Sequence, residues 1–501
     1  MISQKSSFAE FEVRAAAARQ AGKQFAPVYK MIAGDTITPV IAYKAFATNP
    51  SFPSALLESV LPSKDSGRYS IIAINPFLCF ESIDGKGCAT FTVRVTEESD
   101  DPLGQLDALL KRYSPYTTEN DPDFAGGAIG YFGHEAICLL EPSVPRAKID
   151  DVSLPDICLH FYRDVIVFDR DFGKMFLLSN VDVDSRDLNE AFNAGMGACE
   201  SMEKQMFAQN LDLEPGFSIE TENFTATHTQ QEFMGMVAAA KEHLRVGDVF
   251  QVVLSQRFQA DFRGSTLDFY RALRIANPSP YMFHINLGFN HQTALVGASP
   301  EVMSRIDKQG NMLIRPLAGT IQRGNIHQET ANAKKLRRSL KDRAEHRMLV
   351  DLARNDLSRF CSFDSVCEQG VMRVEPYGNL FHMVSDVTGR LAEGVSPFKA
   401  ALGCLPAGTL SGAPKIRAMQ IIAEREGRCR GPYGGSLGLF TDKAVDSCIV
   451  IRSAIINSGE GYIRWQTGAG IVQDSKPKLE FEETLAKGRL INKILREYQH
   501  A

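Results

Sequence analysis

Two acidic segments far apart in the sequence have the residue types and the spacing that suit a divalent cation. Asp342 and Glu345 are three residues apart in the first segment, and Glu480 and Glu483 have the same spacing in the second. Residues three apart lie on one face of a helix. Carboxylates brought together repel one another unless a cation neutralises them, and oxygen ligands without a cysteine cluster suit Mg²⁺. This pattern predicts an enzyme that acts on a small, negatively charged molecule.

The composition is that of an ordinary globular protein. The chain has 501 residues, of which 44% are hydrophobic and 23% charged, and its net charge is -5. This charge gives no support to nucleic-acid binding, and no apolar run approaches the roughly 18 residues of a membrane span. The N-terminal 20 residues also lack the apolar core of a signal peptide. We therefore expect a cytoplasmic protein without nucleic-acid or membrane partners, in which most of the ten scattered cysteines are buried, reduced and structural.

The hydrophobic patterns predict two parts. The first, residues 1–210, is expected to be a β-rich regulatory domain with antiparallel strands over 54–95. The second, residues 225–501, is expected to be the α/β catalytic domain, and 209–225 reads as a linker. Helices are expected at 8–22, 103–113, 184–207, 267–275, 328–356, 397–402, 413–426 and 480–498.

A series of motifs in the second part resembles the chorismate-utilising enzymes, and among them the anthranilate synthase component I family. The motifs lie in order at 277–283, 298–301, 315–320, 342–356, 382–385, 405–415, 433–435, 466–470 and 480–484. The N-terminal match is thinner and rests on 56–59, 67–70 and 126–131. The resemblance implies an α/β (α+β) fold in which large antiparallel sheets pack as a sandwich with flanking helices. Strands would carry Glu301, Arg452 and a glycine turn, and helices the acidic pairs.

The resemblance also implies an Mg²⁺-dependent reaction of chorismate with ammonia that gives anthranilate and pyruvate, in tryptophan biosynthesis. The family draws its ammonia from a glutamine amidotransferase. In this chain the segment around Cys429 superficially matches a nucleophile elbow, G-x-C-x-G, but it follows a helical pattern and only His500 lies downstream. We therefore expect the amidotransferase to be a separate polypeptide.

Individual roles follow from matched positions. Glu345 and Glu483 match the metal ligands, and Asp342 and Glu480 would support them directly or through water. Glu301 matches the general acid, and its apolar setting would raise its pKa. His382 matches a histidine beside the reacting ring, and Gln251 and Thr409 complete the catalytic group. The substrate-binding positions are Gly319, Thr320, Tyr433, Arg452, Gly468, Ala469, Gly470 and Lys487.

Two positions distinguish sister activities. Enzymes that add water carry a lysine where Gln251 stands, and the typical aminodeoxychorismate synthase carries one where Ala318 stands. Both residues therefore favour ammonia as the nucleophile and anthranilate as the product. Two alternatives stay open: another chorismate enzyme, which makes the aminodeoxychorismate isomer or stops at the aminated intermediate, and a catalytically idle protein that senses tryptophan or binds an amidotransferase.

A second group of residues resembles the family's feedback site for L-tryptophan. It comprises Leu57, Glu58, Ser59, Lys64, Pro280, Tyr281 and Met282. The chain departs from the family at His134, Glu135 and Gln420, to which the resemblance assigns no chemistry.

Overall fold

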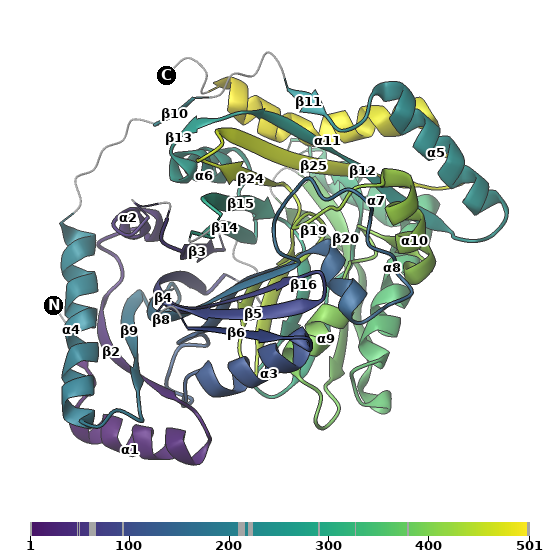
Figure 1. The fold of residues 1–501 in the computed structure, drawn as a ribbon. Coiled ribbons are helices and arrows are strands. Elements are labelled where there is room, and N and C mark those ends of the chain that lie inside the picture. The colour runs from purple at the N-terminus through teal and green to yellow at the C-terminus, as the bar shows by residue number, and fades with distance from the viewer. Residues whose placement is uncertain are drawn as a thin grey trace.

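Antiparallel strands fill the interior of the protein and helices cover them. The computed structural model describes residues 3–47, 49, 51–59, 67–92, 95–208, 216–218, 224–288, 291–325, 327–377 and 380–497. In these residues 23 strands are joined through antiparallel ladders, and two short strands form a separate pair. Figure 1 shows helices on several sides of the strands. The expected fold class, large antiparallel sheets with flanking helices, is confirmed.

The N-terminal strands form the expected meander. Strands β3 (Ser54–Glu58), β4 (Tyr69–Ile83), β5 (Lys86–Phe91) and β6 (Thr96–Ser99) pair in sequence order. Nearby, β2 (Phe25–Ala33) pairs with β9 (Lys174–Asp182), and helices α1 (Phe8–Gln20) and α4 (Leu188–Phe207) pack against that pair (Figure 1).

The C-terminal part contains the strands that hold most of the predicted site. The long ladder between β12 (Gln251–Asp261) and β25 (Tyr462–Ile471) is covered by α5 (Gln230–Arg245), α10 (Lys415–Glu426) and α11 (Pro477–Glu497). A second ladder joins β18 (Leu317–Gln322) to β20 (Leu380–Arg390), and α8 (Leu340–Ser358) packs on both strands.

Strand pairs cross the expected boundary between the two parts. Strand β3 pairs with β14 (Tyr281–Asn286), and β7 (Gly127–Phe132) pairs with β22 (Ser436–Phe440). The N-terminal residues therefore belong to the same strand network as the catalytic candidates. The division at 210–225 stays a prediction, and most of the expected linker lies outside the described residues.

The remaining elements complete the fold. The helices are α2 (Pro39–Lys44), α3 (Pro102–Tyr113), α6 (Thr266–Ala276), α7 (Glu329–Arg338) and α9 (Pro397–Gly403), with 3-10 turns at His134–Leu139 and Phe363–Ser365. The strands are β1 (Gln4–Lys5), β8 (Ile157–Asp169), β10 (Phe217–Ser218), β11 (Thr225–Ala226), β13 (Arg263–Gly264), β15 (Thr293–Ser299), β16 (Val302–Ile306), β17 (Asn311–Ile314), β19 (Cys367–Tyr377), β21 (Gly412–Ala413), β23 (Val445–Ile449) and β24 (Ser453–Asn457).

The single helix predicted over 328–356 was wrong, because it is two helices. Ser339 separates α7 from α8 with an extended backbone, φ -64° and ψ 115°, and its hydroxyl accepts a hydrogen bond from the Asp342 amide. Serine favours this capping position because its side chain satisfies an amide that the first helical turn leaves unpaired. The break sets the residue at which α8 begins, and therefore the positions of Asp342 and Glu345 along this helix.

Within the described residues, none of the helices combines the length and the apolar character needed to cross a bilayer.

Candidate active site

Glu301 lies in the short connection between β15 and β16. Its side chain is buried, and the Thr409 hydroxyl donates to both carboxylate oxygens at 3.3 and 3.4 Å. Burial raises the pKa of Glu301 to about 8, although the hydrogen bond from Thr409 acts in the opposite direction. A carboxyl with this pKa keeps its proton at neutral pH and can donate it to a leaving group.

His382 on β20 lies directly opposite Thr320 on β18. The Thr320 hydroxyl is 3.1 Å from the imidazole Nδ1, and the Tyr377 ring lies edge-on with its centroid 5.5 Å away. Burial lowers the pKa of His382 to about 4, and the positive charge of Arg452 adds to that effect. The imidazole is therefore neutral at physiological pH and is able to accept a proton.

Arg452 lies between β23 and β24 with a left-handed backbone, φ 49°. Its carbonyl accepts a hydrogen bond from the amide of Ala298, three residues before Glu301. No carboxylate pairs with its guanidinium in the part of the chain that the structure describes. A free guanidinium close to a neutral imidazole suits the binding of an anionic group.

The glycines at 468–470 lie within strand β25 and not in a turn, which corrects the expectation from the sequence. A Cβ at Gly468 would lie 3.1 Å from the Tyr433 hydroxyl, so that hydroxyl faces bare backbone. The Lys487 ammonium donates to the Gly468 carbonyl at 2.8 Å. Ala469 points the other way, into the apolar core beneath α5 and α10, so only its backbone can contribute to a site on this side.

The two acidic pairs are brought into one neighbourhood from α8 and α11. The pKa of Glu345 is raised by burial and then by the negative charges of Asp342 and Glu483. The pKa of Glu480 is raised by burial, and the charge of Glu483 adds to it. Lys487 offsets part of this repulsion, because its ammonium pairs with Glu483 at 2.8 Å. A cation between the two helices would remove the remaining repulsion, and oxygen donors suit a divalent metal, although no three of these carboxylates converge within 4.8 Å among the described residues.

Gly319 precedes Thr320 on β18 and lies in close contact with Asp342, one of the proposed metal ligands on α8. Its φ is +65°, and a Cβ there would lie 3.0 Å from the Cβ of Asp342. A side chain would therefore strain the backbone and push α8 away from β18. Gln251, at the start of β12, lies beside the glycine strand, because a Cβ at Gly470 would meet its Nε2 at 3.3 Å.

Several residues that position the site were missed in the sequence. The Glu135 carboxylate accepts hydrogen bonds from the amides of Arg430 and Gly431 at 2.8 and 2.9 Å. The buried Arg430 guanidinium pairs with Glu426 at 2.6 Å, and Glu426 also accepts from the Ser255 amide at 2.7 Å. These contacts fix the segment that leads to Tyr433. His134 and Glu135 differ from the usual family residues, and this difference was visible in the sequence. Their role could not be predicted, because Glu135 contacts residues almost 300 positions later in the chain.

Cys429 has none of the features of an amidotransferase nucleophile. It follows α10, as the sequence indicated, and its thiol is buried against the Ala147 carbonyl. Burial raises the pKa of Cys429 to about 12, so the thiolate is not available at neutral pH. His500 lies outside the described residues.

Glu301 borders a space of only about 30 Å³. A larger cavity, of about 460 Å³, is lined by Leu57, Glu58, Ser59, Pro280, Tyr281 and Met282. The structure thus brings together six of the seven residues matched to a tryptophan site. Lys64 lies outside the described residues.

Two contacts define the walls of this cavity. The Tyr281 hydroxyl donates to Asp446 at 2.8 Å. The Glu58 carboxylate is turned toward α6, where it accepts from the Tyr270 hydroxyl at 2.6 Å and pairs with Arg274 at 3.1 Å. The carboxylate of Glu58 is therefore held by the protein itself.

Solved structures with this fold are chorismate-utilising enzymes. Anthranilate synthase component I from Streptococcus pneumoniae TIGR4 superposes with a TM-score of 0.74 at 32% identity, over 91% of this chain and 98% of that one. The menaquinone-specific isochorismate synthase from Escherichia coli superposes with a TM-score of 0.68 over 97% of this chain and 99% of that one; at 18% identity, this likeness concerns the fold alone.

Sequence comparison agrees with the fold. The chorismate binding enzyme family matches residues 60–493. Anthranilate synthase component 1 from Acetivibrio thermocellus is 36% identical over 94% of this chain and 95% of that protein. The protein of the same name from Pseudomonas putida is 39% identical over 91% and 92%. The chain belongs to the chorismate binding enzyme family.

Proposed function

We propose that this chain is the chorismate-converting component of an anthranilate synthase, a lyase that makes anthranilate and pyruvate from chorismate and ammonia in tryptophan biosynthesis. The observation that carries the proposal is that Arg452 links a protonated Glu301 to a neutral His382: its carbonyl accepts from Ala298, three residues before Glu301, and its charge helps to lower the pKa of the buried His382. The similarity to anthranilate synthase component 1 proteins over most of the chain supports the same reading.

Glu301, His382 and Arg452 have different roles in the proposed reaction. Ammonia forms a bond to the ring carbon C2, the two ring double bonds shift, and the C4–O bond breaks. Glu301 gives its proton to the departing hydroxyl, which leaves as water, and the new ammonium group loses a proton. In the second step the C2 proton is lost, for which His382 is a neutral acceptor, the C3–O bond breaks, and the enolpyruvate that leaves takes up a proton and becomes pyruvate. Arg452 pairs with a substrate carboxylate.

Glu345 and Glu483 would hold Mg²⁺, with Asp342 and Glu480 bound to it directly or through water. The support is the raised pKa of Glu345, which burial causes first and the negative charges of Asp342 and Glu483 increase. When bound, the ion supplies Lewis-acid stabilisation of a substrate carboxylate. Lys487 lies beside these acids, where it pairs with Glu483 and donates to the Gly468 carbonyl, and would orient the substrate from there.

Two neutral side chains favour ammonia over water and over an enzyme nucleophile. Gln251 is buried beside Gly470 and cannot act as a base for water. Ala318 is buried on β18, two residues before Thr320, and offers no amine to the ring. Free ammonia is scarce at neutral pH, and the buried Cys429 does not supply it, so we propose a separate glutamine amidotransferase as the partner chain.

L-Tryptophan is the proposed inhibitor, and the cavity of about 460 Å³ beneath Tyr281 is its proposed site. Apolar walls from Leu57 and Met282 suit an indole ring, while polar groups at the rim suit the amino-acid head.

Product analysis tests the function. Purified chain is mixed with chorismate, an ammonium salt at mildly alkaline pH and Mg²⁺, without any partner. Fluorescent anthranilate with equimolar pyruvate is the expected result. The isomer 4-amino-4-deoxychorismate, or an aminated product without pyruvate, would contradict it. Absence of turnover, with tryptophan still bound, would point to an idle sensor.

A further inference from the structure

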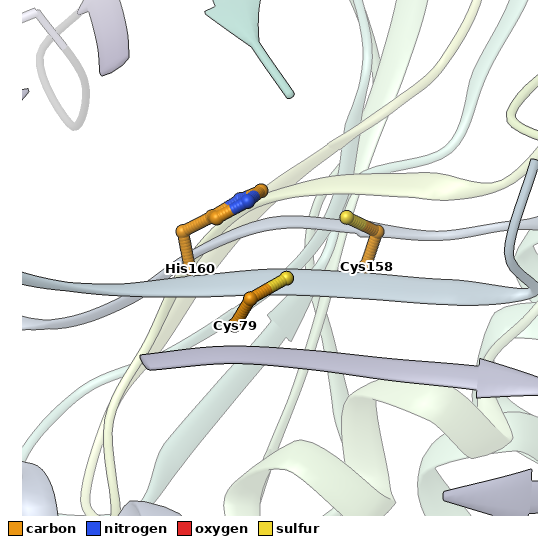
Figure 2. Close-up of side chains that lie close together, drawn as sticks. All are labelled: Cys79, Cys158 and His160. Atoms are coloured by element: carbon orange, nitrogen blue, oxygen red, sulfur yellow. The ribbon is translucent and has the colours of Figure 1, made fainter. Parts of the chain in front are cut away.

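A cluster of metal-binding side chains lies in the N-terminal strands and includes none of the residues assigned above. Cys79 on β4 lies directly opposite His160 on β8, and Cys158 lies directly opposite Glu81. Residues two apart on a strand point to the same face. All four side chains therefore project from one face of the β4–β8 ladder, and Figure 2 shows the two thiols and the imidazole of this group.

The donor atoms lie nearly close enough to share an ion. The two sulfur atoms and a ring nitrogen of His160 all lie within 4.8 Å of one another. Tetrahedral zinc has Zn–S bonds of about 2.3 Å, which places two sulfur ligands about 3.8 Å apart. Cys158 and His160 are fully buried and Cys79 is 6% exposed. Small side-chain rotations, without movement of the strands, would complete the geometry.

The surroundings of the cluster contain a carboxylate near one of the sulfur atoms and a group that holds this carboxylate in place. The Glu81 Oε1 atom is 4.0 Å from the Cys158 sulfur. The same oxygen is 2.6 Å from the His291 Nε2, which fixes the orientation of the carboxylate. The backbone of Leu287 lies close to the His160 imidazole. Ligands held in this way by outer partners are typical of protein metal sites.

We propose that Cys79, Cys158 and His160, with Glu81 as the fourth ligand, bind one Zn²⁺ ion. Two thiolates, an imidazole and a carboxylate form a borderline-soft set that suits tetrahedral zinc and does not suit Mg²⁺. Each thiol releases its proton when the ion binds. Leu287 and His291 lie between β14 and β15, so the ion would join the N-terminal ladder to the strands that lead to Glu301. Its role is structural.

Metal analysis of the whole chain tests this site. Because the ligands are buried, the metal is supplied during expression, as Zn²⁺ or as Co²⁺, and the protein is then dialysed against Mg²⁺. We expect one zinc per chain and, in the cobalt form, the near-ultraviolet charge-transfer band of thiolate coordination. Cys79→Ser and Cys158→Ser should lose both. Cys199→Ser, a buried cysteine on α4, and Glu483→Gln should retain both. His291→Ala should weaken zinc binding roughly 10- to 100-fold.

Three results would overturn the proposal. The first is wild-type protein without zinc after growth with the metal. The second is a cobalt form of the wild-type protein without the thiolate band. This test stays valid even if a serine variant does not fold. The third is a Cys79–Cys158 disulfide in freshly isolated protein, found by intact mass and peptide mapping, because oxidised sulfurs cannot ligate zinc.

Discussion

Tyr281 lies directly opposite Ser299 on the adjacent antiparallel strand, and Ser299 contacts the backbone of Glu301 two residues further on. The Tyr281 hydroxyl is at the same time held by Asp446 on the wall of the large cavity. One cross-strand pair therefore connects the proposed tryptophan site to the proposed acid. A ligand that shifts β14 would change the position of Glu301, which is a physical route for feedback inhibition.

Ser299→Ala should reduce this coupling. We expect tryptophan to bind with little change in affinity, while its inhibition of turnover weakens several-fold, because the Ser299 hydroxyl no longer ties the strand end to Glu301. Calorimetry gives the binding constant and initial rates give the inhibition. Coupling is reciprocal, so chorismate should also lose its effect on tryptophan affinity. Ser304→Ala, whose hydroxyl pairs with Ser447 beyond the acid, is the control. Equal inhibition in Ser299→Ala and wild type would exclude this route.

Glu301→Gln should remove activity without harming the fold. The amide keeps the size of the side chain but has no acidic proton to give, so we expect kcat to fall roughly 10²- to 10⁴-fold. Rates of anthranilate formation measure this, and Glu368→Gln, on a half-exposed strand, serves as the control. Wild-type rates in Glu301→Gln would assign the proton donor to another residue.

The same residue predicts a pH dependence of rate and stability. Glu301 is protonated below its pKa of about 8, so the rate at saturating free ammonia should fall as pH rises above that value. Its folded pKa lies above the unfolded value of about 4.3, so the carboxyl binds its proton more tightly when folded. Stability from this group is therefore fully present below about pH 4 and is lost as pH rises toward 8. Glu301→Gln should melt higher than wild type at pH 9, and the difference should shrink at pH 5. A lower melting temperature at pH 9 would contradict this account.

The sequence predicted the helices and strands better than it predicted where they begin and end. Long periodic segments such as 103–113 and 184–207 were found as helices, because packing and local pattern agree there. The break at Ser339 was missed, although serine is a common cap, because the apolar pattern continues through it. The glycines at 468–470 were expected to turn, yet the pairing partner β12 keeps them extended. That partner lies more than 200 residues earlier in the chain.

The sequence predicted the site residues that belong to family motifs. It did not predict the residues that hold them in place through tertiary contacts. Glu301, His382 and Arg452 stood out by resemblance. Glu135, which holds the backbone before Tyr433, did not, because its role depends on a contact between the two parts of the chain. The Cys79 cluster was also missed, since a strand register, not a spacing such as C-x-x-C, brings its residues together.

Gln251→Lys should change the nucleophile. A lysine beside Gly470 would introduce an amine into a buried position where the amide now lies. We expect ammonia-dependent formation of anthranilate to fall at least about tenfold, because burial favours the neutral amine, a base that can activate water. Chromatography of the products should then show a hydroxylated ring product. Gln256→Lys, five residues along the same strand and buried beside Thr484, is the control for the added amine. Unchanged anthranilate as the single product would mean that residue 251 does not select the nucleophile.

Glu483→Gln should abolish the dependence of turnover on Mg²⁺. Glu483 on α11 adds to the rise in the pKa of Glu345 on α8 that burial and Asp342 mainly cause, and its loss removes one of the two proposed direct ligands. We expect kcat/KM at saturating Mg²⁺ to fall roughly 100-fold or more, in line with removing a group that stabilises the transition state. Anthranilate fluorescence is followed during titration with Mg²⁺ and again after a chelator. Glu482→Gln is the matched control, because this neighbouring residue on α11 is exposed and faces Lys478. A wild-type Mg²⁺ midpoint in Glu483→Gln would show that the metal, if required, is held by other residues.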